Sequence, residues 1–451
     1  MSEWRKVRVG EIAEKIAIGP FGSRMKSDTY TETGGPVIRG TNLTGGRSFS
    51  GDWVYVSEED ADQLINCNVT EGDLVFPHRG AIGEVGIVPG DKDRYMLSTS
   101  LMKLRCDAKQ ADSLYLFYFF KSHEGRHQLL RNASQVGTPG IGQPLSSLKS
   151  IELALPPLKN QRTIAHILGS LDDKIELNRR MNETLEAMAR AIYKSWFVDF
   201  DPVRAKASGE PAESICRRLG LTPDVLALFP DGFQDSKLGE IPAGWTVTSL
   251  SDLTTKIGSG ATPRGGRDVY LEEGIALIRS QNVYDSEFVW DGLARISDEA
   301  ADQLSGVEVK GGDVLLNITG ASILRTCVVD PAVLPARVNQ HVAIVRAKPG
   351  IPPKYLHLQL LRKSTKDYLL GMNAGASREA VTKGHIESVP IVRPSVDVLS
   401  RFQAIVVSLG LQGEQSAQQS RVLASIRDTL LPSLLCGHID ISTARAKERS
   451  H

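Results

Sequence analysis

The chain has 451 residues and a formal net charge of zero, with 53 basic and 53 acidic residues. That length corresponds to about three domains with sizeable cores. A zero net charge argues against a nonspecific nucleic-acid coat but leaves room for local basic surfaces. No run of about 18 apolar residues is present, and the charged N-terminus does not resemble a secretory signal, so we expect a cytoplasmic protein with no membrane span. Five single cysteines without a CxxC pair fit a reducing compartment and argue against a zinc or disulfide scaffold.

The first module is predicted over residues 1–155. Short apolar runs bounded by Gly, Pro and Asp predict strands at 73–76, 85–88 and 102–104, and 114–130 predicts one helix. We therefore expect a β-rich α/β core with much loop, and loops held by rigid elements often carry function.

A first long helix is predicted over 156–198. Apolar and amide residues recur there at alternating steps of four and three, as in the seam of a coiled coil of about four heptads. The expected helix-pairing residues are Ile164, Leu168, Leu171, Ile175, Asn178, Asn182, Leu185, Ala189, Ile192 and Trp196.

Residues 199–244 are rich in Pro, Gly and charge, and we interpret them as an ordered connector. A second module follows over 245–392, with strands expected at 314–317, 327–329 and 343–346 and a helix at 353–370. Four pairs of segments relate the two modules at one offset of 240 positions: 37–43 with 277–283, 61–64 with 301–304, 71–76 with 311–316, and 115–116 with 355–356. The chain is thus predicted to be an internal repeat.

A second long helix is predicted over 393–436, with Pro432 ending its apolar run, before a polar tail at 437–451. Its expected seam is Val398, Phe402, Ile405, Leu409, Gln412, Ser416, Gln419, Leu423, Ile426 and Leu430. Both seams are polar in the middle. Antiparallel pairing would set amide against amide, and a shifted register would leave them unpaired at about 1–3 kcal/mol each. We take the polar middle as the feature that fixes register, although three glycines leave open two unrelated surface helices.

Motifs for catalysis are missing from the sequence. Gly258–Gly266 lacks the Lys-Ser/Thr of a P-loop, and no HExxH, GxSxG, GxGxxG or Asn/Asp-Pro-Pro-aromatic motif is present. A PD…DxK-like pattern at 230–237 has its carboxylates too close together for a nuclease metal site and reads as coincidence. We expect no catalytic residue, no metal and no cofactor in this chain.

Arginines, lysines and amides cluster in the turn-rich parts of both modules. Arg can read guanine and Asn or Gln can read adenine in the major groove, whereas Lys and helix-borne Arg more often hold phosphate. The candidates are Arg24, Lys26, His78, Arg79, Lys121, Arg126, Arg131, Arg264, Arg267, Asn317, Thr319, Arg325, Asn339, Gln340, Lys363 and Lys366. For any one of them a solvated surface charge is the commoner explanation. Arg39, Asn42, Arg279 and Asn282 recur in both modules and are expected to be structural.

The order module, helix, module, helix resembles the specificity subunit of type I restriction–modification systems. The segments that carry the resemblance are 155–164 (LPPLKNQRTI), 192–203 (IYKSWFVDFDPV), 238–245 (LGEIPAGW) and 430–437 (LLPSLLCG). The second helix departs from the pattern, since 392–396 lacks the usual Pro-Pro and following Gln.

The resemblance implies a non-catalytic subunit that binds double-stranded DNA through two target recognition domains, each reading one half of a bipartite, asymmetric site. The helices would pair antiparallel, set the spacer and dock two methyltransferase subunits. S-adenosylmethionine would belong to those subunits, and ATP and Mg to motor and endonuclease subunits.

Three other functions remain open at this point. An orphan DNA-binding adaptor would lack a methyltransferase partner. A nuclease or methyltransferase acting alone would show activity as a single chain. A coiled-coil scaffold would show no salt-dependent DNA binding.

Overall fold

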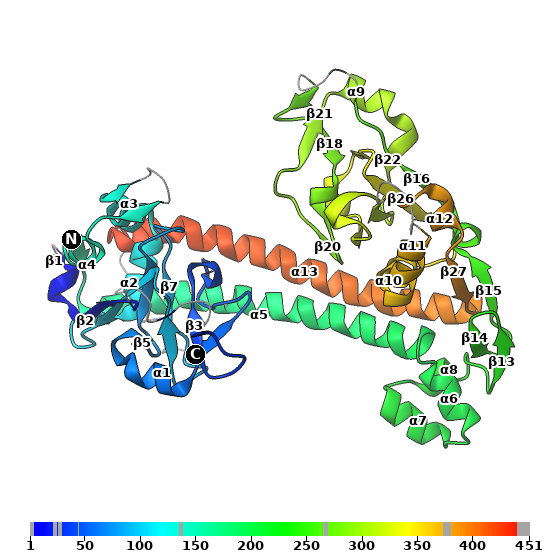
Figure 1. Ribbon diagram of the computed structural model, residues 1–451, viewed down its shortest axis with the longest axis horizontal. Helices are drawn as coiled ribbons and strands as arrows, with labels where there is room; N and C mark the ends of the chain where they lie inside the picture. The colour runs from blue at the N-terminus through cyan, green and yellow to red at the C-terminus, as the bar shows by residue number, and fades with distance from the viewer. Residues whose placement is uncertain are drawn as a thin grey trace. The chain divides into compact units, whose positions relative to one another are not determined.

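The computed structural model describes residues 4–20, 25, 29–43, 45–134, 139–263, 265, 269–372 and 380–439. Two helices of 40 residues each, α5 (Leu158–Phe197) and α13 (Val396–Leu435), are accompanied by many short strands (Figure 1). The chain divides into two compact units: unit 1 is Met1–Met181 with Gln415–His451, and unit 2 is Asn182–Glu414. Each long helix therefore contributes to both units. This mixed helix and strand architecture agrees with the predicted fold class.

Unit 1 contains two four-stranded sheets and a short pair of strands. The first sheet has the order β2 (Ala13–Ile18), β9 (Leu101–Cys106), β6 (Leu74–Pro77), β7 (Gly86–Ile87) and is antiparallel throughout. The second has the order β4 (Val54–Val56), β3 (Gly35–Ile38), β8 (Tyr95–Leu97), β5 (Asn68–Val69). All four residues of β6 are buried, which explains its unbroken apolar sequence. β1 (Arg5–Arg8) pairs with β12 (Glu152–Leu155), which leads directly into α5.

Unit 2 repeats this plan. Its four-stranded sheet has the order β16 (Thr254–Ser259), β26 (Val342–Ala347), β23 (Val314–Asn317), β24 (Thr326–Val328). Its second sheet has the order β17 (Tyr270–Leu271), β21 (Ala294–Ile296), β18 (Ile275–Ile278), β25 (Ala336–Val338), β22 (Glu308–Val309). β15 (Thr246–Ser249) pairs with β27 (Pro390–Arg393) as β1 pairs with β12. Each unit also has one parallel strand pair at the matching place, β3 with β8 and β18 with β25.

The predicted single helices at 114–130 and 353–370 are wrong, because each is broken. The first is α2 (Ser113–Lys121) followed by α3 (His123–Leu130), and Ser122 caps α3 by accepting a hydrogen bond from the Gly125 amide. A Cβ at Gly125 would lie 2.1 Å from the Phe119 carbonyl oxygen, so the tight corner needs glycine. Unit 2 breaks at Arg362, between α10 (Pro353–Leu361) and α11 (Lys363–Gly371).

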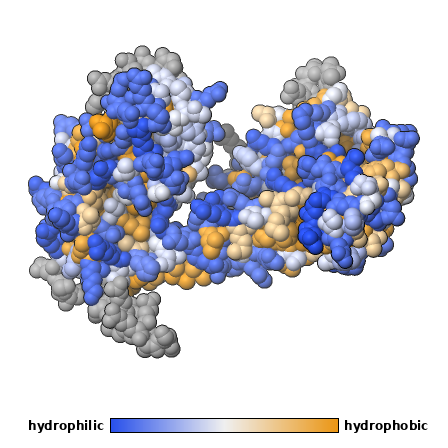
Figure 2. Space-filling model, turned by 90° about the horizontal axis from the view of Figure 1, so that it is seen from below, coloured by the Kyte–Doolittle hydropathy of each residue, from blue (hydrophilic) through white to orange (hydrophobic). Residues whose placement is uncertain are grey.

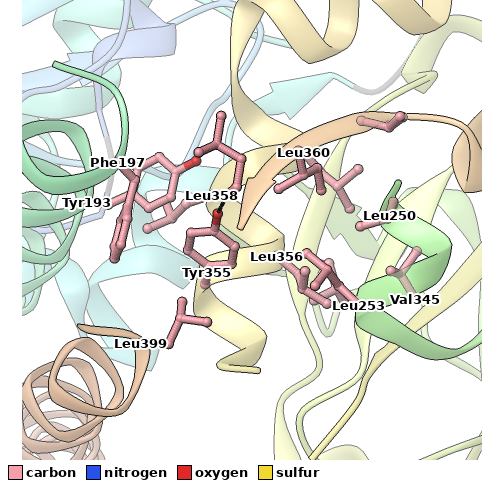
Figure 3. Packing of buried hydrophobic residues seen from close by; sticks show 14 of the residues in the cluster. Tyr193, Phe197, Leu250, Leu253, Val345, Tyr355, Leu356, Leu358, Leu360 and Leu399 are labelled. Carbon is pink, nitrogen blue, oxygen red and sulfur yellow. Dashed lines mark hydrogen bonds between the residues drawn. The ribbon is translucent and has the colours of Figure 1, made fainter. Parts of the chain in front are cut away.

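The connector is ordered and packs on the end of α5. It forms α6 (Asp201–Ala207), α7 (Ala212–Leu219) and α8 (Pro223–Leu226), then the hairpin β13 (Phe233–Ser236) and β14 (Gly239–Pro242). Figure 3 shows Tyr193 and Phe197 of α5 beside Tyr355 of α10 in the core of unit 2. The Phe197 and Tyr355 rings meet edge to face, with centroids 5.0 Å apart.

The remaining regular elements are short and lie around these cores. They are α1 (Glu58–Gln63), α4 (Pro144–Lys149), α9 (Asp298–Gln303), α12 (Lys383–Glu387), β10 (Ala133–Ser134), β11 (Gly140–Ile141), β19 (Val283–Tyr284) and β20 (Glu287–Phe288). Among the described residues, no helix combines the length and the apolar character that crossing a membrane requires.

One buried position differs in kind between the two sheets. Lys103 of β9 pairs with Val75 of β6, and the matching residue of β26, opposite Leu315, is Ile344. Lys103 is 1% exposed, and its ammonium donates a hydrogen bond to the Asn68 carbonyl. Burial lowers the pKa of Lys103, and the nearby Asp73 carboxylate only partly opposes that shift.

Lys103→Met should change how stability depends on pH. The pKa of Lys103 is lower in the folded chain than in the unfolded chain, so the unfolded chain binds more protons between the two values. Stability from this group therefore rises with pH until the unfolded lysine titrates, at about pH 10.4. We expect the unfolding free energy of the wild type to gain on that of Lys103→Met as pH rises from 7 to about 10. Urea unfolding, followed by the fluorescence of unit 1, would measure this difference in unfolding free energy. The control is Lys109→Met, at an exposed lysine, which should leave the pH dependence unchanged. A constant difference across this range would contradict the expectation.

Candidate nucleic-acid interface and helix pair

Two repeated polar contacts build the same scaffold in both units. The first is an asparagine corner: Asn42 Oδ1 accepts the Arg39 amide at 3.0 Å, and its Nδ2 donates to the Ser50 and Asp52 carbonyls. Asn282 repeats this with the Arg279 amide, also at 3.0 Å, and with the Val289 and Asp291 carbonyls. Both asparagines are fully buried, so the prediction that they are structural is confirmed.

The second repeated contact is a two-pronged ion pair between strands of the four-stranded sheet. Arg105 Nε and Nη2 lie 2.7 Å from the two oxygens of Asp73, and Arg346 binds Asp313 in the same way at 2.7 and 2.8 Å. Both carboxylates are buried, and paired donors of this kind fix geometry as well as charge. Sequence reasoning missed the arginines, because they recur at an offset of 241 rather than the 240 that relates the aspartates.

Three candidates for DNA contact belong to the interior, so these predictions are wrong. His78 is buried with Nε2 3.2 Å from the Thr99 carbonyl oxygen, and burial lowers its pKa, which keeps the ring neutral at pH 7. Asn317 is fully buried, and its Nδ2 donates to the Ser280 carbonyl at 2.9 Å. Asn339 is buried and accepts the His341 amide through Oδ1. Each side chain satisfies backbone groups next to a strand end, which explains why a polar residue follows an apolar run there.

The other unit 1 candidates lie on the surface. Arg79 and Arg131 are exposed. Arg126 forms an ion pair with Glu84 at 2.8 Å. The Lys121 ammonium donates to the Gly45 carbonyl, and desolvation lowers its pKa. These cations border α2, α3 and the turn after β6.

In unit 2 several candidates gather around the hairpin of β19 and β20. The Arg325 guanidinium lies over the Tyr284 ring, 4.4 Å from its centroid, and the Tyr284 side chain is itself exposed. Lys366 of α11 pairs with Asp285 of the same hairpin at 2.8 Å. In the described chain, no carboxylate is paired with Arg325, so its charge is available to an anionic ligand.

The remaining described candidates of unit 2 contact other side chains of the same unit. Thr319 Oγ1 lies 2.6 Å from His341 Nδ1, and Gln340 accepts a hydrogen bond from Thr262. Lys363 is fully on the surface beside Asp367. Arg24, Lys26, Arg264 and Arg267 lie outside the described residues. No three His, Cys, Asp or Glu side chains group as a metal site would in the described part of the chain.

The α5 seam follows the predicted positions. Ile164, Leu168, Asn178, Ala189 and Trp196 are buried. Leu171, Ile175, Asn182, Leu185 and Ile192 are half-buried. Within unit 1, Asn178 Nδ2 donates to Gln419 Oε1 at 3.0 Å and to the Ser416 carbonyl and Ser420 Oγ at 3.3 Å. A buried amide thus meets the polar middle of α13.

Three of the ten predicted α13 seam positions, Gln412, Gln419 and Ile426, lie one residue before the inward-facing position. Phe402, Leu409, Ser416 and Leu423 face inward as expected, and Ile405 is half-buried, but Gln412 and Ile426 are exposed. The inward positions that complete the heptads are 406, 413, 420 and 427. Gln419 is largely exposed and reaches Asn178 only through the end of its side chain.

Chemistry explains that shift. Adjacent residues of a helix point about 100° apart, so positions 405, 412, 419 and 426 or positions 406, 413, 420 and 427 can complete a seam with Phe402 and its heptad repeats. Apolar Ile426 favours the first series, whereas the structure uses the second. In the structure Gly413 faces Asn182 and Leu185 of α5, and Arg427 pairs inward with Asp172 at 2.7 Å. Tyr118 also donates to Asp172, at 2.6 Å, which ties α2 to the same carboxylate. The helix predicted over 393–436 is observed as α13, which continues past Pro432 to Leu435. Proline costs little there, since only the final turn follows it.

With this geometry established, comparisons with known proteins become informative. Residues 1–187 match the family model of the type I restriction modification DNA specificity domain. The type I restriction enzyme HindI specificity subunit of Haemophilus influenzae is 28% identical, over 97% of this chain and 100% of the relative. The MjaIX specificity subunit of Methanocaldococcus jannaschii is 26% identical, over 73% and 69%. The type I restriction–modification S subunit from M. genitalium shares the fold, with TM-score 0.55 and 16% identity over 96% of each chain.

The fold and the repeated modules thus define a protein built from two similar halves, each completed by parts of both long helices. The chain is similar along nearly its whole length to type I restriction enzyme specificity subunits, and residues 1–187 match the family model of their DNA specificity domain.

The corrected seam can be tested at two neighbouring residues. Ile426→Lys should change the unfolding free energy by no more than about 0.5 kcal/mol, since Ile426 is 42% exposed. Arg427→Ala should cost about 1–3 kcal/mol, because it leaves the Asp172 carboxylate without its partner. Denaturant unfolding of both variants measures the contrast. A larger loss of unfolding free energy in Ile426→Lys than in Arg427→Ala would instead support the seam predicted from the sequence.

Proposed function

We propose that this chain is the sequence-recognition subunit of a type I restriction–modification system, and that the module of each unit reads one half of a bipartite, asymmetric DNA site. In this proposal the chain performs no catalytic step. Two methyltransferase subunits supply S-adenosylmethionine chemistry, and motor and endonuclease subunits supply ATP- and Mg-dependent cleavage. The complex acts in the cytoplasm.

One observation carries the proposal: the scaffold repeats while the surface does not. The asparagine corner and the Asp–Arg pair are the same in both units. β6 and β23 match at an offset of 240, so exposed Arg79 corresponds to Thr319. Their partners β7 and β24 match at an offset of 241, so Glu84 corresponds to Arg325. A common support with different side chains above it suits two readers of different sequences.

The Arg325 and Tyr284 pair is the best candidate for a base contact. A guanidinium held over an exposed ring is restricted in position, and arginine matches the two acceptors of guanine in the major groove. The exposed cations near α2 and α3 in unit 1, such as Arg79 and Arg131, suit phosphate contacts that position the module.

The two long helices support the rest of the proposal. Each contributes to both units, so their fixed length is the feature that would set the spacer between the half-sites. An orphan adaptor or a scaffold without modification partners is not favoured, because the chain aligns with a specificity subunit along 97% of its length.

Genome-wide mapping of methylated adenine in cells carrying the complete system tests this function. We expect one motif with two unlike half-sites and a spacer of constant length. Deletion of this chain should abolish methylation at every copy of the motif. A palindrome, a contiguous motif or methylation that persists in the deletion strain would refute the proposal.

Arg325→Ala should relax selectivity at a base of one half-site only. The loss expected for a two-pronged guanine contact is about 1–3 kcal/mol, or roughly fivefold to 150-fold in discrimination. Tyr284→Phe should preserve selectivity, and Tyr284→Ala should lower it, because only the ring is needed to orient the guanidinium. Competition binding with variants of the mapped site measures this. Lys363→Ala, at a side chain 89% exposed, is the matched control and should leave selectivity unchanged. Equal loss of affinity for all sequences in Arg325→Ala would make Arg325 a phosphate contact instead.

A further inference from the structure

The internal repeat allows one surface of unit 1 to be compared with its copy in unit 2. β1 matches β15, so Trp4 corresponds to Trp245, which also directly precedes its strand. α5 and α13 have the same length, so the end of α13 in unit 1 corresponds to the end of α5 in unit 2, and Leu435 corresponds to Phe197. The residues that follow correspond as well, with His438 at the place of Phe200.

In unit 2 the connector covers this place. Trp245 is 2% exposed, and the Phe197 and Phe200 rings lie 6.1 and 5.8 Å from its ring. Phe233 of the connector contacts Phe200 at 6.2 Å, and Gln234 donates to the Trp245 carbonyl at 2.8 Å. The copy in unit 2 therefore shows both that the surface is covered and which chemistry covers it, namely phenylalanine side chains at the start of α6 and in β13.

In unit 1 the same place is a groove of about 1180 Å³. It is lined by Trp4, Phe119, Leu431, Leu435, Cys436 and Ile439, among others. Trp4 and Leu435 are half-buried, and Ile439 is 37% exposed. Trp4 packs against the chain after α13, since a Cβ at Gly437 would lie 2.8 Å from its ring. Among the described residues, none supplies the ring that Phe200 supplies in unit 2, because His438 is exposed.

Exposed apolar surface of this kind marks an interaction site. Figure 2 shows apolar patches on an otherwise hydrophilic face, and the groove adds a concave one with a defined shape. The lining also includes charged side chains, among them Lys6, Glu124 and Glu152, and protein interfaces combine apolar and polar groups in this way.

We propose that this groove is a docking site for a segment of the methyltransferase subunit that carries aromatic side chains, and that the segment stands where the connector stands in unit 2. The inference rests on the proposed function, because it takes the methyltransferase subunit as the partner. The inference adds a site that is open in unit 1, whereas the chain's own connector covers the matching place in unit 2.

The exposed thiol of Cys436 reports on the groove directly. Cys67, Cys106 and Cys327 are buried, so a Cys216→Ser chain leaves Cys436 as the accessible thiol. We expect addition of the methyltransferase subunit of the same system to slow maleimide labelling of Cys436 by at least about tenfold, because thiol reactivity follows exposure. A cysteine placed at Ile65, which is 69% exposed in the same unit, is the control and should keep its labelling rate in a Cys216→Ser, Cys436→Ser chain.

Variants complete the test. Ile439→Asp should weaken assembly with the methyltransferase subunit by about tenfold or more, since it sets a charge in an apolar contact. Ile65→Asp should not, and both chains should bind the bipartite DNA site as the wild type does. An unchanged Cys436 rate in the assembled complex would overturn the docking site and leave the proposed function standing.

Three further results would also overturn the docking site. One is faster labelling of Cys436 after removal of residues 440–451 in the free chain, which would assign the groove to the chain's own tail. Another is protection that rises with the concentration of this chain alone, which would assign it to a second copy. The third is failure of the wild type to bind any methyltransferase subunit, which would refute the proposed function together with the inference.

Discussion

The pairing of α5 with α13 is the contact on which both units depend. In unit 1 the start of α5 contributes Ile164 and Leu168 to the module core, and the end of α13 contributes Leu434. In unit 2 the start of α13 contributes Phe402, and the end of α5 contributes Trp196 and Phe197. Neither module therefore has a complete core without both helices. A 40-residue helix gains most of its stability from such packing rather than from intrinsic propensity.

The helix pair uses polar contacts where apolar ones would permit slippage. Asn178 meets Gln419 and Ser420, and Arg427 meets Asp172, so a shift of one heptad would leave an amide and a carboxylate without partners. Asp172 also accepts a hydrogen bond from Tyr118, which couples the register of the helices to the position of α2. The same interaction thus fixes the helices and one module against each other within unit 1.

The buried scaffold is repeated in both units, whereas the surface side chains differ. The buried Asp73–Arg105 and Asp313–Arg346 pairs hold equivalent strands, while surface positions such as Arg79 and Thr319 are free to differ. The same comparison reveals what is not repeated. The connector covers Trp245 in unit 2, and Trp4 borders an open groove in unit 1. The two copies thus share a scaffold but differ in their surface side chains and in whether this place is covered.

The sequence by itself determined the order of modules and helices, because heptad periodicity and an offset of 240 positions survive any arrangement in space. It also showed that Asn42 and Asn282 are structural, since both copies keep them. It could not place His78, Asn317 or Asn339, because a polar residue after a strand looks the same whether it faces solvent or a neighbouring carbonyl. The choice between Ile426 and Arg427 likewise needed the tertiary structure. Hydrophobicity favours isoleucine, and only the proximity of Asp172, 255 positions away in the chain, turns arginine inward. Local pattern is written in neighbouring residues, whereas the pairing of buried charges depends on which distant segments the fold brings together.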